Sequence, residues 1–202
     1  MTLLTIAQEV SRYCGIPSPD AVIGSTDREM QELLAFINDT GIEIARRVEW
    51  GEIEKEAIVY GVGSAVALDL PGDFDRLTSG VSVRYNNLIV RPLTRSEWNM
   101  LTPIMVENTP RYYLVENDSI RLFPYLEDGD QIKVNYLSKW WVGGTAATFS
   151  TDGDSPVFDE KMIVIGTVAR WKRQKGQDYQ EYEAEYEAIL SQRANFDNGR
   201  RF

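Results

Sequence analysis

The residues of this chain best suited to chemistry are three groups of carboxylates. Clustered carboxylates can bind divalent cations, or act as a general acid and a general base. All three groups lie in turn-like sequence, where aspartate is expected because its side chain bonds to nearby backbone. We therefore interpret them as turn and cap residues, with a metal or acid–base site as the alternative. They are Asp69, Asp73 and Asp75; Glu127, Asp128 and Asp130; and Asp152, Asp154, Asp159 and Glu160.

The third group fails the spacing test for a calcium loop. An EF-hand loop places its ligands in the pattern D-x-[DN]-x-[DN]-G. Asp152 and Asp154 take the first two positions, but Pro156 stands where the third ligand belongs. The sequence predicts a solvated loop that leads into a helix cap.

Other residue types that catalytic sites need are missing or isolated. The chain has no histidine, the commonest general base and metal ligand. Cys14, the one cysteine, lies in an apolar helical stretch and is expected to be a buried, inert thiol. Gly61-Val62-Gly63 lacks the third glycine of a dinucleotide loop and is interpreted as a turn. We therefore expect no enzymatic activity, no metal and no cofactor.

The charge balance limits the kinds of molecule that the protein can bind. The chain has 202 residues with 31 acidic and 21 basic side chains, a net charge of −10. A chain with this charge does not attract nucleic acid through its overall electrostatic field. The acidity favours solubility, or a surface past which DNA slides. The first ten residues lack the features of a signal peptide, and no apolar run approaches the ~20 residues of a membrane span. We expect a soluble protein made in the cytoplasm.

Apolar spacings of three and four predict helices at both ends of the chain. The first covers residues 3–14. A longer one runs from about residue 27 to 50, capped by Thr26 with Glu29 as its reciprocal partner, or by Ser25 or Asp27 instead.

Three further helical features complete this part of the prediction. Gly41 lies on the apolar stripe of the long helix, which close approach of another helix would explain. Residues 158–175 are apolar nearly all round and predict a buried helix. A tyrosine-rich acidic helix follows Asp178.

The middle of the chain has the pattern of strands split by turns. Three hairpins are predicted, over residues 57–70 with a glycine-rich connection, over 81–90 with Asn86-Asn87 at the turn, and over 111–123. A strand at 131–137 follows. Thr94 and Glu97 indicate a short capped helix over 94–101.

Together these elements predict an α+β fold. A helical bundle is expected from residues 1–51 and 157–193, with an antiparallel β-rich module inserted at 52–138. Residues 139–156 form a loop that holds Trp140 and Trp141. Either one ring closes the core while the other packs nearby, or the pair is a hydrophobic anchor for a neighbouring subunit.

The last residues are expected to form an extended arm over 194–202, either frayed or ordered by docking on a partner. Aromatic and arginine side chains, the types that dominate interface hot spots, are frequent there. The candidate docking residues are Arg193, Ala194, Asn195, Phe196, Asp197, Asn198, Gly199, Arg200, Arg201 and Phe202.

Both ends of the chain resemble a family, the head-to-tail adaptors (connector or head-completion proteins) of tailed phages. The N-terminal part is TLLTIAQEVSRYCGIPSPDAVIGSTDREMQELLAFINDTGIEIARRVEW, a short helix, a proline-containing loop and a long helix that ends in Arg-Arg and Trp. The C-terminal part is VARWKRQKGQDYQEYEAEYEAIL, a buried helix, a basic joint and an acidic tyrosine-rich helix. The resemblance covers most of the chain and rests on overall pattern.

The resemblance implies a structural virion protein that forms a ring, usually of twelve subunits, beneath the portal at the neck of the virion. The arm would dock on the portal protein, the β-rich module would face tail or nozzle proteins, and DNA would pass through the channel without specific binding. No membrane is implied.

Two other readings remain open. One is a different virion part, a tail-completion or tail-tube protein. The other is a carbohydrate-binding module that stacks sugars on Trp98, Trp140 or Trp141, or a metal-dependent hydrolase that uses Asp73 or Asp75.

Overall fold

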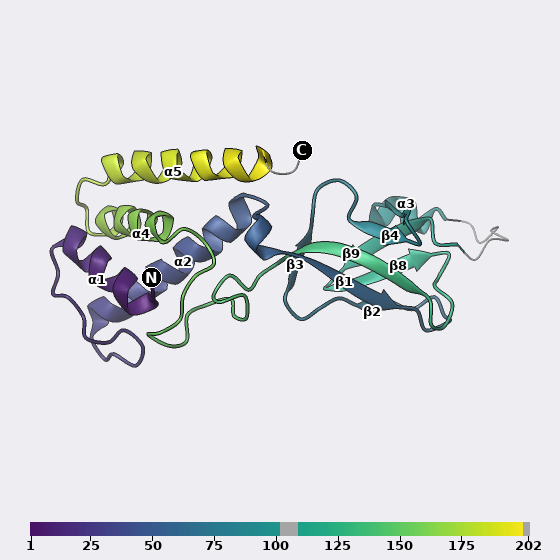
Figure 1. Cartoon of the computed structure of the whole chain (residues 1–202), viewed down its shortest axis with the longest axis horizontal. Helices are drawn as coiled ribbons and strands as arrows, with labels where there is room; N and C mark the ends of the chain where they lie inside the picture. The colour runs from purple at the N-terminus through teal and green to yellow at the C-terminus, as the bar shows by residue number, and fades with distance from the viewer. Residues whose placement is uncertain (102–108, 200–202) are drawn as a thin grey trace. The chain divides into compact units, whose positions relative to one another are not determined.

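The chain alternates between helical and β-rich sequence, and the computed structural model, which describes residues 1–101 and 109–199, forms two compact units (Figure 1). One, which we call the helical unit, comprises Met1–Ile53 and Lys139–Phe202. The other, the β unit, comprises Glu54–Ser138. The predicted α+β class is confirmed.

The helical unit is organised around its most apolar helix, α4 (Glu160–Gln174), which contacts α1 (Leu3–Cys14), α2 (Arg28–Arg47) and α5 (Gln180–Gly199). Nine α4 side chains or glycines are buried, as its apolar sequence predicts. A short 3-10 helix, η1 (Gly51–Ile53), follows α2.

Asp27 caps α2, because its Oδ1 accepts the backbone N–H of Glu29 at 3.0 Å. The sequence offered Asp27 as an alternative cap to Thr26 and Ser25, and the prediction of a cap at Thr26 is wrong. The aspartate also places a negative charge at the positive end of the helix dipole.

Residues 139–159 form an irregular strap that ties the helical unit together. Its carbonyls at Asp154 and Asp152 accept the N–H groups of Leu3 and Leu4, at 2.8 and 3.2 Å, where α1 has no partners of its own. The N–H of Phe149 donates to Asn38 Oδ1 on α2 at 3.0 Å. The strap thus bonds to the backbone of α1 and to a side chain of α2.

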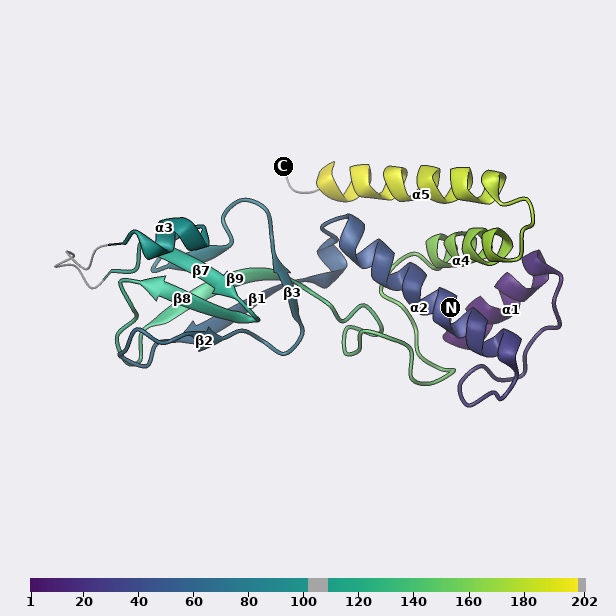
Figure 2. The same ribbon diagram turned by 180° about the vertical axis from the view of Figure 1, so that it is seen from behind.

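The described residues of the β unit form two sheets that enclose one apolar core (Figures 1 and 2). Sheet A has the order β1-β9-β4-β5, and β3 also pairs with β9; sheet B has the order β2-β8-β7-β6. The pairs are antiparallel except β6 with β7. The strands are β1 (Glu54–Tyr60), β2 (Leu68–Asp69), β3 (Phe74–Leu77), β4 (Val83–Tyr85), β5 (Leu88–Ile89), β6 (Arg91–Pro92), β7 (Tyr112–Glu116), β8 (Ser119–Phe123) and β9 (Gln131–Ser138).

Two of the three predicted hairpins are confirmed. β4 pairs with β5 and β7 pairs with β8, and the turn residues Asn86, Asn87, Asn117 and Asp118 all have positive φ. Asparagine and aspartate tolerate this conformation, which tight hairpin turns require.

The hairpin predicted over residues 57–70 is wrong. β1 pairs with β9 along its whole length, and β2 pairs with β8. Gly61 follows β1 where a β-carbon would lie 2.3 Å from the carbonyl oxygen of Glu127. The glycine therefore permits close approach to a distant segment, not a tight turn between neighbours.

The short helix α3 (Arg95–Asn99) is capped as predicted, by a box in which Thr94 and Glu97 bond each other's backbone. The helix ends at Asn99, two residues before its predicted end at residue 101. Trp98 packs edge-on against Phe123 of β8, with ring centroids 6.3 Å apart. Trp98 thereby covers the outer side of sheet B.

Candidate functional site

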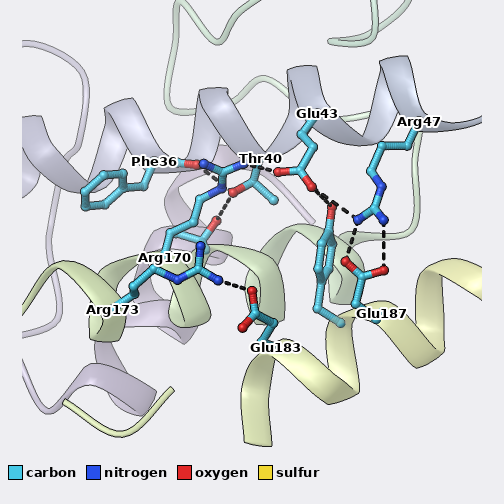
Figure 3. Close-up of polar contacts among 10 residues, drawn as sticks. Phe36, Thr40, Glu43, Arg47, Arg170, Arg173, Glu183 and Glu187 are labelled. Carbon is cyan, nitrogen blue, oxygen red and sulfur yellow. Dashed lines mark hydrogen bonds and ion pairs between the residues drawn. The ribbon is translucent and has the colours of Figure 1, made fainter. Parts of the chain in front are cut away.

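Glutamates of α5 pair with basic residues on α2 and α4 (Figure 3). Between Gln180 and Asn195, α5 buries only Tyr186 and Leu190. Several of its other contacts with α2 and α4 are ion pairs. We call this array the α5 clasp.

Tyr186 of α5 packs against α4 at a glycine. A β-carbon at Gly166 would lie 2.9 Å from Tyr186 Cε2 and 2.8 Å from Thr40 Cγ2, so only glycine fits beneath the ring without displacement. Burial, and then the charge of Glu43, raise the pKa of Tyr186 to about 12. Its hydroxyl, 3.5 Å from Glu43 Oε1, is neutral at physiological pH.

Glu43 on α2 contacts side chains of α2, α4 and α5. It pairs with Arg170 of α4, accepts from Arg47 at 3.3 Å, and lies beside Tyr186 of α5. Figure 3 shows its carboxylate between the side chains of Arg170 and Arg47. One carboxylate thus joins the three helices.

Arg47 makes the bidentate contact of the clasp. Its Nη1 and Nη2 donate to Glu187 Oε1 and Oε2 at 2.5 and 2.9 Å. The hydrogen bond with Glu187 is the main cause that raises the pKa of the Arg47 guanidinium further above its ordinary value. Fork-to-fork geometry of this kind fixes orientation as well as distance.

Further ion pairs run along the same helix. Arg173 pairs with Glu183, and Lys161 pairs with Glu185 at 2.8 Å. Lys172 and Arg173 also lie 4.8 Å from the ring centres of Tyr182 and Tyr179. An exposed ion pair contributes little alone, so the attachment of α5 depends on the number of such pairs as well as on Tyr186 and Leu190.

The predicted arm begins within this helix. Because α5 continues to Gly199, the backbone over residues 194–199 is helical, and the expected extended conformation is wrong there. Arg193 pairs with Asp159 at the start of α4. Ala194 is half-buried and Asn195 is exposed. Residues 200–202 lie outside the described residues. The docking role of the segment stays a prediction.

The two tryptophans of the strap have different environments. Trp141 is 1% exposed: it packs on Gly41, stacks on Phe158 and meets Phe149 edge-on. Its burial contradicts a role as an exposed anchor. Trp140 is half-buried, and its role as an interface anchor stays a prediction.

The carboxylates of the strap have structural partners. Asp152 accepts the N–H groups of Val22 and Ile23 at 3.1 and 2.9 Å. Asp154 accepts from Ser150 and Thr151, and the Thr151 hydroxyl bond, the largest cause, lowers its pKa to about 2. Asp159 caps α4, and Glu160 pairs with the N-terminal amine.

Asp73 is the most buried of the remaining candidates. Lys55 and Ser138 donate to its Oδ2 at 2.7 and 2.8 Å, and Tyr136 donates to Oδ1 at 2.9 Å. Burial alone would raise its pKa, but these hydrogen bonds outweigh burial and lower it. The carboxylate joins β1, β3 and β9, so its bonding capacity is used within the fold.

The candidate carboxylates Asp75 and Asp130 also have partners within the fold. Asp75 pairs with its neighbour Arg76 at 2.7 Å, and Asp130 accepts from Tyr85 at 2.8 Å. Over residues 1–101 and 109–199, no cluster of carboxylates, cysteines or histidines has the arrangement of a metal site. Cys14 is half-buried, and burial raises the pKa of its thiol to about 11.

Sequence reasoning missed the α5 clasp, although the signal was present. The tyrosine-rich acidic helix was predicted without partners for its glutamates. Arg170 and Arg173, three residues apart and so on one side of α4, could have indicated a charged face. In the described residues no helix has the length and apolar character needed to cross a membrane.

A comparison with protein families matches residues 1–201 to the family described as SU10 adaptor protein. A comparison with curated proteins finds no match. The family match spans both units and nearly every residue, and it agrees with the resemblance at the two ends of the chain. The chain belongs to the SU10 adaptor protein family, a family of phage head-to-tail adaptors.

Proposed function

We propose that this protein forms a ring beneath the portal, links the DNA-filled capsid to the tail and lines the channel through which DNA passes. The observation that carries the proposal is the family match over residues 1–201. The net charge of −10 supports a channel wall that does not hold DNA. Tail-side partners would meet the β unit.

The C-terminal segment is the proposed portal contact. It follows Leu190, the last buried residue among the described side chains of α5. Arg200, Arg201 and Phe202 add two cations and an aromatic ring of the types found in interface hot spots. Repeated weak contacts around a ring would add avidity.

The test is co-sedimentation with portal rings of the same virus, comparing the full chain with a chain that ends at Arg193. The shortened chain keeps Tyr186, Leu190 and the Arg193–Asp159 pair, so α5 should stay attached. We expect saturable binding that is lost on truncation. Arg28→Ala, on the exposed side of α2, is the control that should bind like the full chain.

Binding that survives truncation would keep the adaptor role and move the portal contact elsewhere. If neither chain sediments with portal rings, the proposal is wrong, and a tail-completion or tail-tube role becomes the next candidate.

A further inference from the structure

Strand β1 is a free edge of sheet A. The strand order begins with β1, and among the described strands it pairs with β9 on one side alone. An edge strand presents a row of unpaired N–H and C=O groups, and natural edges are usually kept short or interrupted by proline or a bulge. β1 has seven residues, no proline and an unbroken register with β9. It is therefore able to pair with another extended chain.

The register shows which backbone groups of β1 are free. The N–H of Gly61, just after β1, donates to the carbonyl of Asp130 at 2.8 Å, so these two residues form a hydrogen-bonded pair. Bonded and non-bonded pairs alternate along an antiparallel ladder, so β1 residues at odd positions bond to β9, and those at even positions point their backbone groups away from it. In the described part of the chain nothing bonds to the outward backbone groups of three residues, Glu56, Ile58 and Tyr60.

The side chains along this edge are apolar or already paired. Ile58 and Tyr60 are 47% and 60% exposed. Glu56 pairs within its own chain, with Lys133 at 3.0 Å and with Arg84 at 3.9 Å. These cations offset the charge of Glu56, so a second copy with a net charge of −10 meets little repulsion at this edge.

We infer that β1 of one copy pairs antiparallel with β1 of a second copy, with Ile58 opposite Ile58. Each outward residue then faces an outward residue, because Glu56 of each copy lies opposite Tyr60 of the other. Residues opposed in this way exchange two N–H···O bonds per pair, so the free backbone groups of all three positions are satisfied. The A sheets of the two copies become one continuous sheet.

The sequence of β1 selects this register. Sliding one strand by two residues in one direction sets Ile58 opposite Glu56, and sliding it by four sets Glu56 opposite Glu56, a destabilising pair of like charges. Sliding it the other way carries the pairs past Tyr60, where β1 ends. The proposed register instead joins Ile58 to itself and places a tyrosine opposite Glu56, a combination without opposed like charges.

A strand pair that is its own complement makes a two-fold contact. A second copy fits this edge because one sequence supplies both halves of every pair. Rings repeat a head-to-tail contact instead, so this inference goes beyond the proposed ring and describes the free protein before it meets a portal.

Sedimentation equilibrium of the full chain, without portal rings, tests the contact. We expect a reversible dimer. Ile58→Lys should weaken this dimer about tenfold, because the register sets the two lysines directly opposite each other. Ile89→Lys is the matched control. Ile89 is another exposed isoleucine of sheet A, 59% accessible on β5, and its change should leave the dimer as it is.

Amide hydrogen exchange of the natural chain at rising protein concentration is the second measurement. Dimer formation should slow the exchange of the Glu56, Ile58 and Tyr60 amides about tenfold, since each N–H gains a partner. The amides of Ala57 and Val59 bond to β9 in every copy and should change much less. This alternation separates strand pairing from a contact made through side chains alone.

A full chain that remains a monomer at its highest soluble concentration overturns the inference. So does a dimer that Ile58→Lys forms as readily as the natural chain, or one in which the three outward amides keep their monomer exchange rates. If Ile58→Lys does not fold, the exchange measurement on the natural chain decides. Binding to portal rings is measured separately, so the adaptor role can hold or fail without affecting this outcome.

Discussion

Trp141 packs its six-membered ring directly on Gly41, and a β-carbon added at that glycine would lie 2.1 Å from the ring carbon Cη2. Phe149 and Phe158 flank the indole, with centroids 5.1 and 6.3 Å from it. The strap is therefore held on α2 at the one position of the helix where this ring can approach the backbone. The sequence had suggested another helix at Gly41, but a loop tryptophan fills the place.

Gly41→Ala is expected to destabilise the helical unit by about 2–3 kcal/mol, because the methyl group forces the buried ring to move. Urea unfolding followed by tryptophan fluorescence measures the change. Gly153→Ala, where the nearest side-chain atom would be 3.9 Å away, is the control and should change stability little. Equal stability of the two variants would contradict the packing described for Trp141.

Glu187→Gln is expected to loosen α5 without unfolding the protein. The change removes the charge that faces Arg47 in a partly exposed bidentate pair, which contributes about 0.5–1 kcal/mol. Amide hydrogen exchange along α5 should increase, and high salt should reduce the difference between the variant and the natural chain. Glu29→Gln, at the start of α2, serves as the control. Unchanged exchange in α5 would show that Tyr186 and Leu190 suffice to hold it.

Tyr186 makes the attachment of α5 sensitive to alkali. Its pKa is raised to about 12 in the folded chain, from 10 for an ordinary tyrosine, so its neutral form is favoured in the fold. The resulting stabilisation is complete below pH 10 and is lost as the pH rises towards 12. Hydrogen exchange of α5 at increasing pH, corrected for the intrinsic rate, should show this loss. Tyr186→Phe should show a smaller dependence over the same range, and an identical dependence would exclude this tyrosine as its cause.

Asp73→Ala is expected to destabilise the β unit by about 3 kcal/mol, since it leaves Lys55, Tyr136 and Ser138 without their common acceptor. The pKa of Asp73 is lowered in the fold, so its contribution is present above the ordinary aspartate pKa of 3.8 and is lost as the pH falls through the folded value. Chemical unfolding at pH 7 and pH 3 measures both effects.

Asp75→Ala, which removes the ion pair with the adjacent Arg76, is the matched control and should destabilise the β unit less than Asp73→Ala does. If Asp73→Ala left stability unchanged at pH 7, the structural role of this carboxylate would be wrong, and the hydrolase alternative would regain interest.

The sequence by itself determined the local elements, because their causes are local. The Thr94–Glu97 capping box and the Asn86-Asn87 turn each act within a few residues, and both are present as expected. The all-round apolar pattern of α4 likewise predicted its burial. The α+β class and the family resemblance followed from the order of such elements.

Tertiary structure decided which distant residues meet. The sequence of β1 fits several partners equally well, and only the enclosed core selects β9, 71 residues beyond its end, over the nearby β2. The same holds for Trp141 against Gly41 and for Glu187 against Arg47. Such contacts depend on the geometry of the whole unit, because shape and charge complementarity exist only once the helices and strands are packed together.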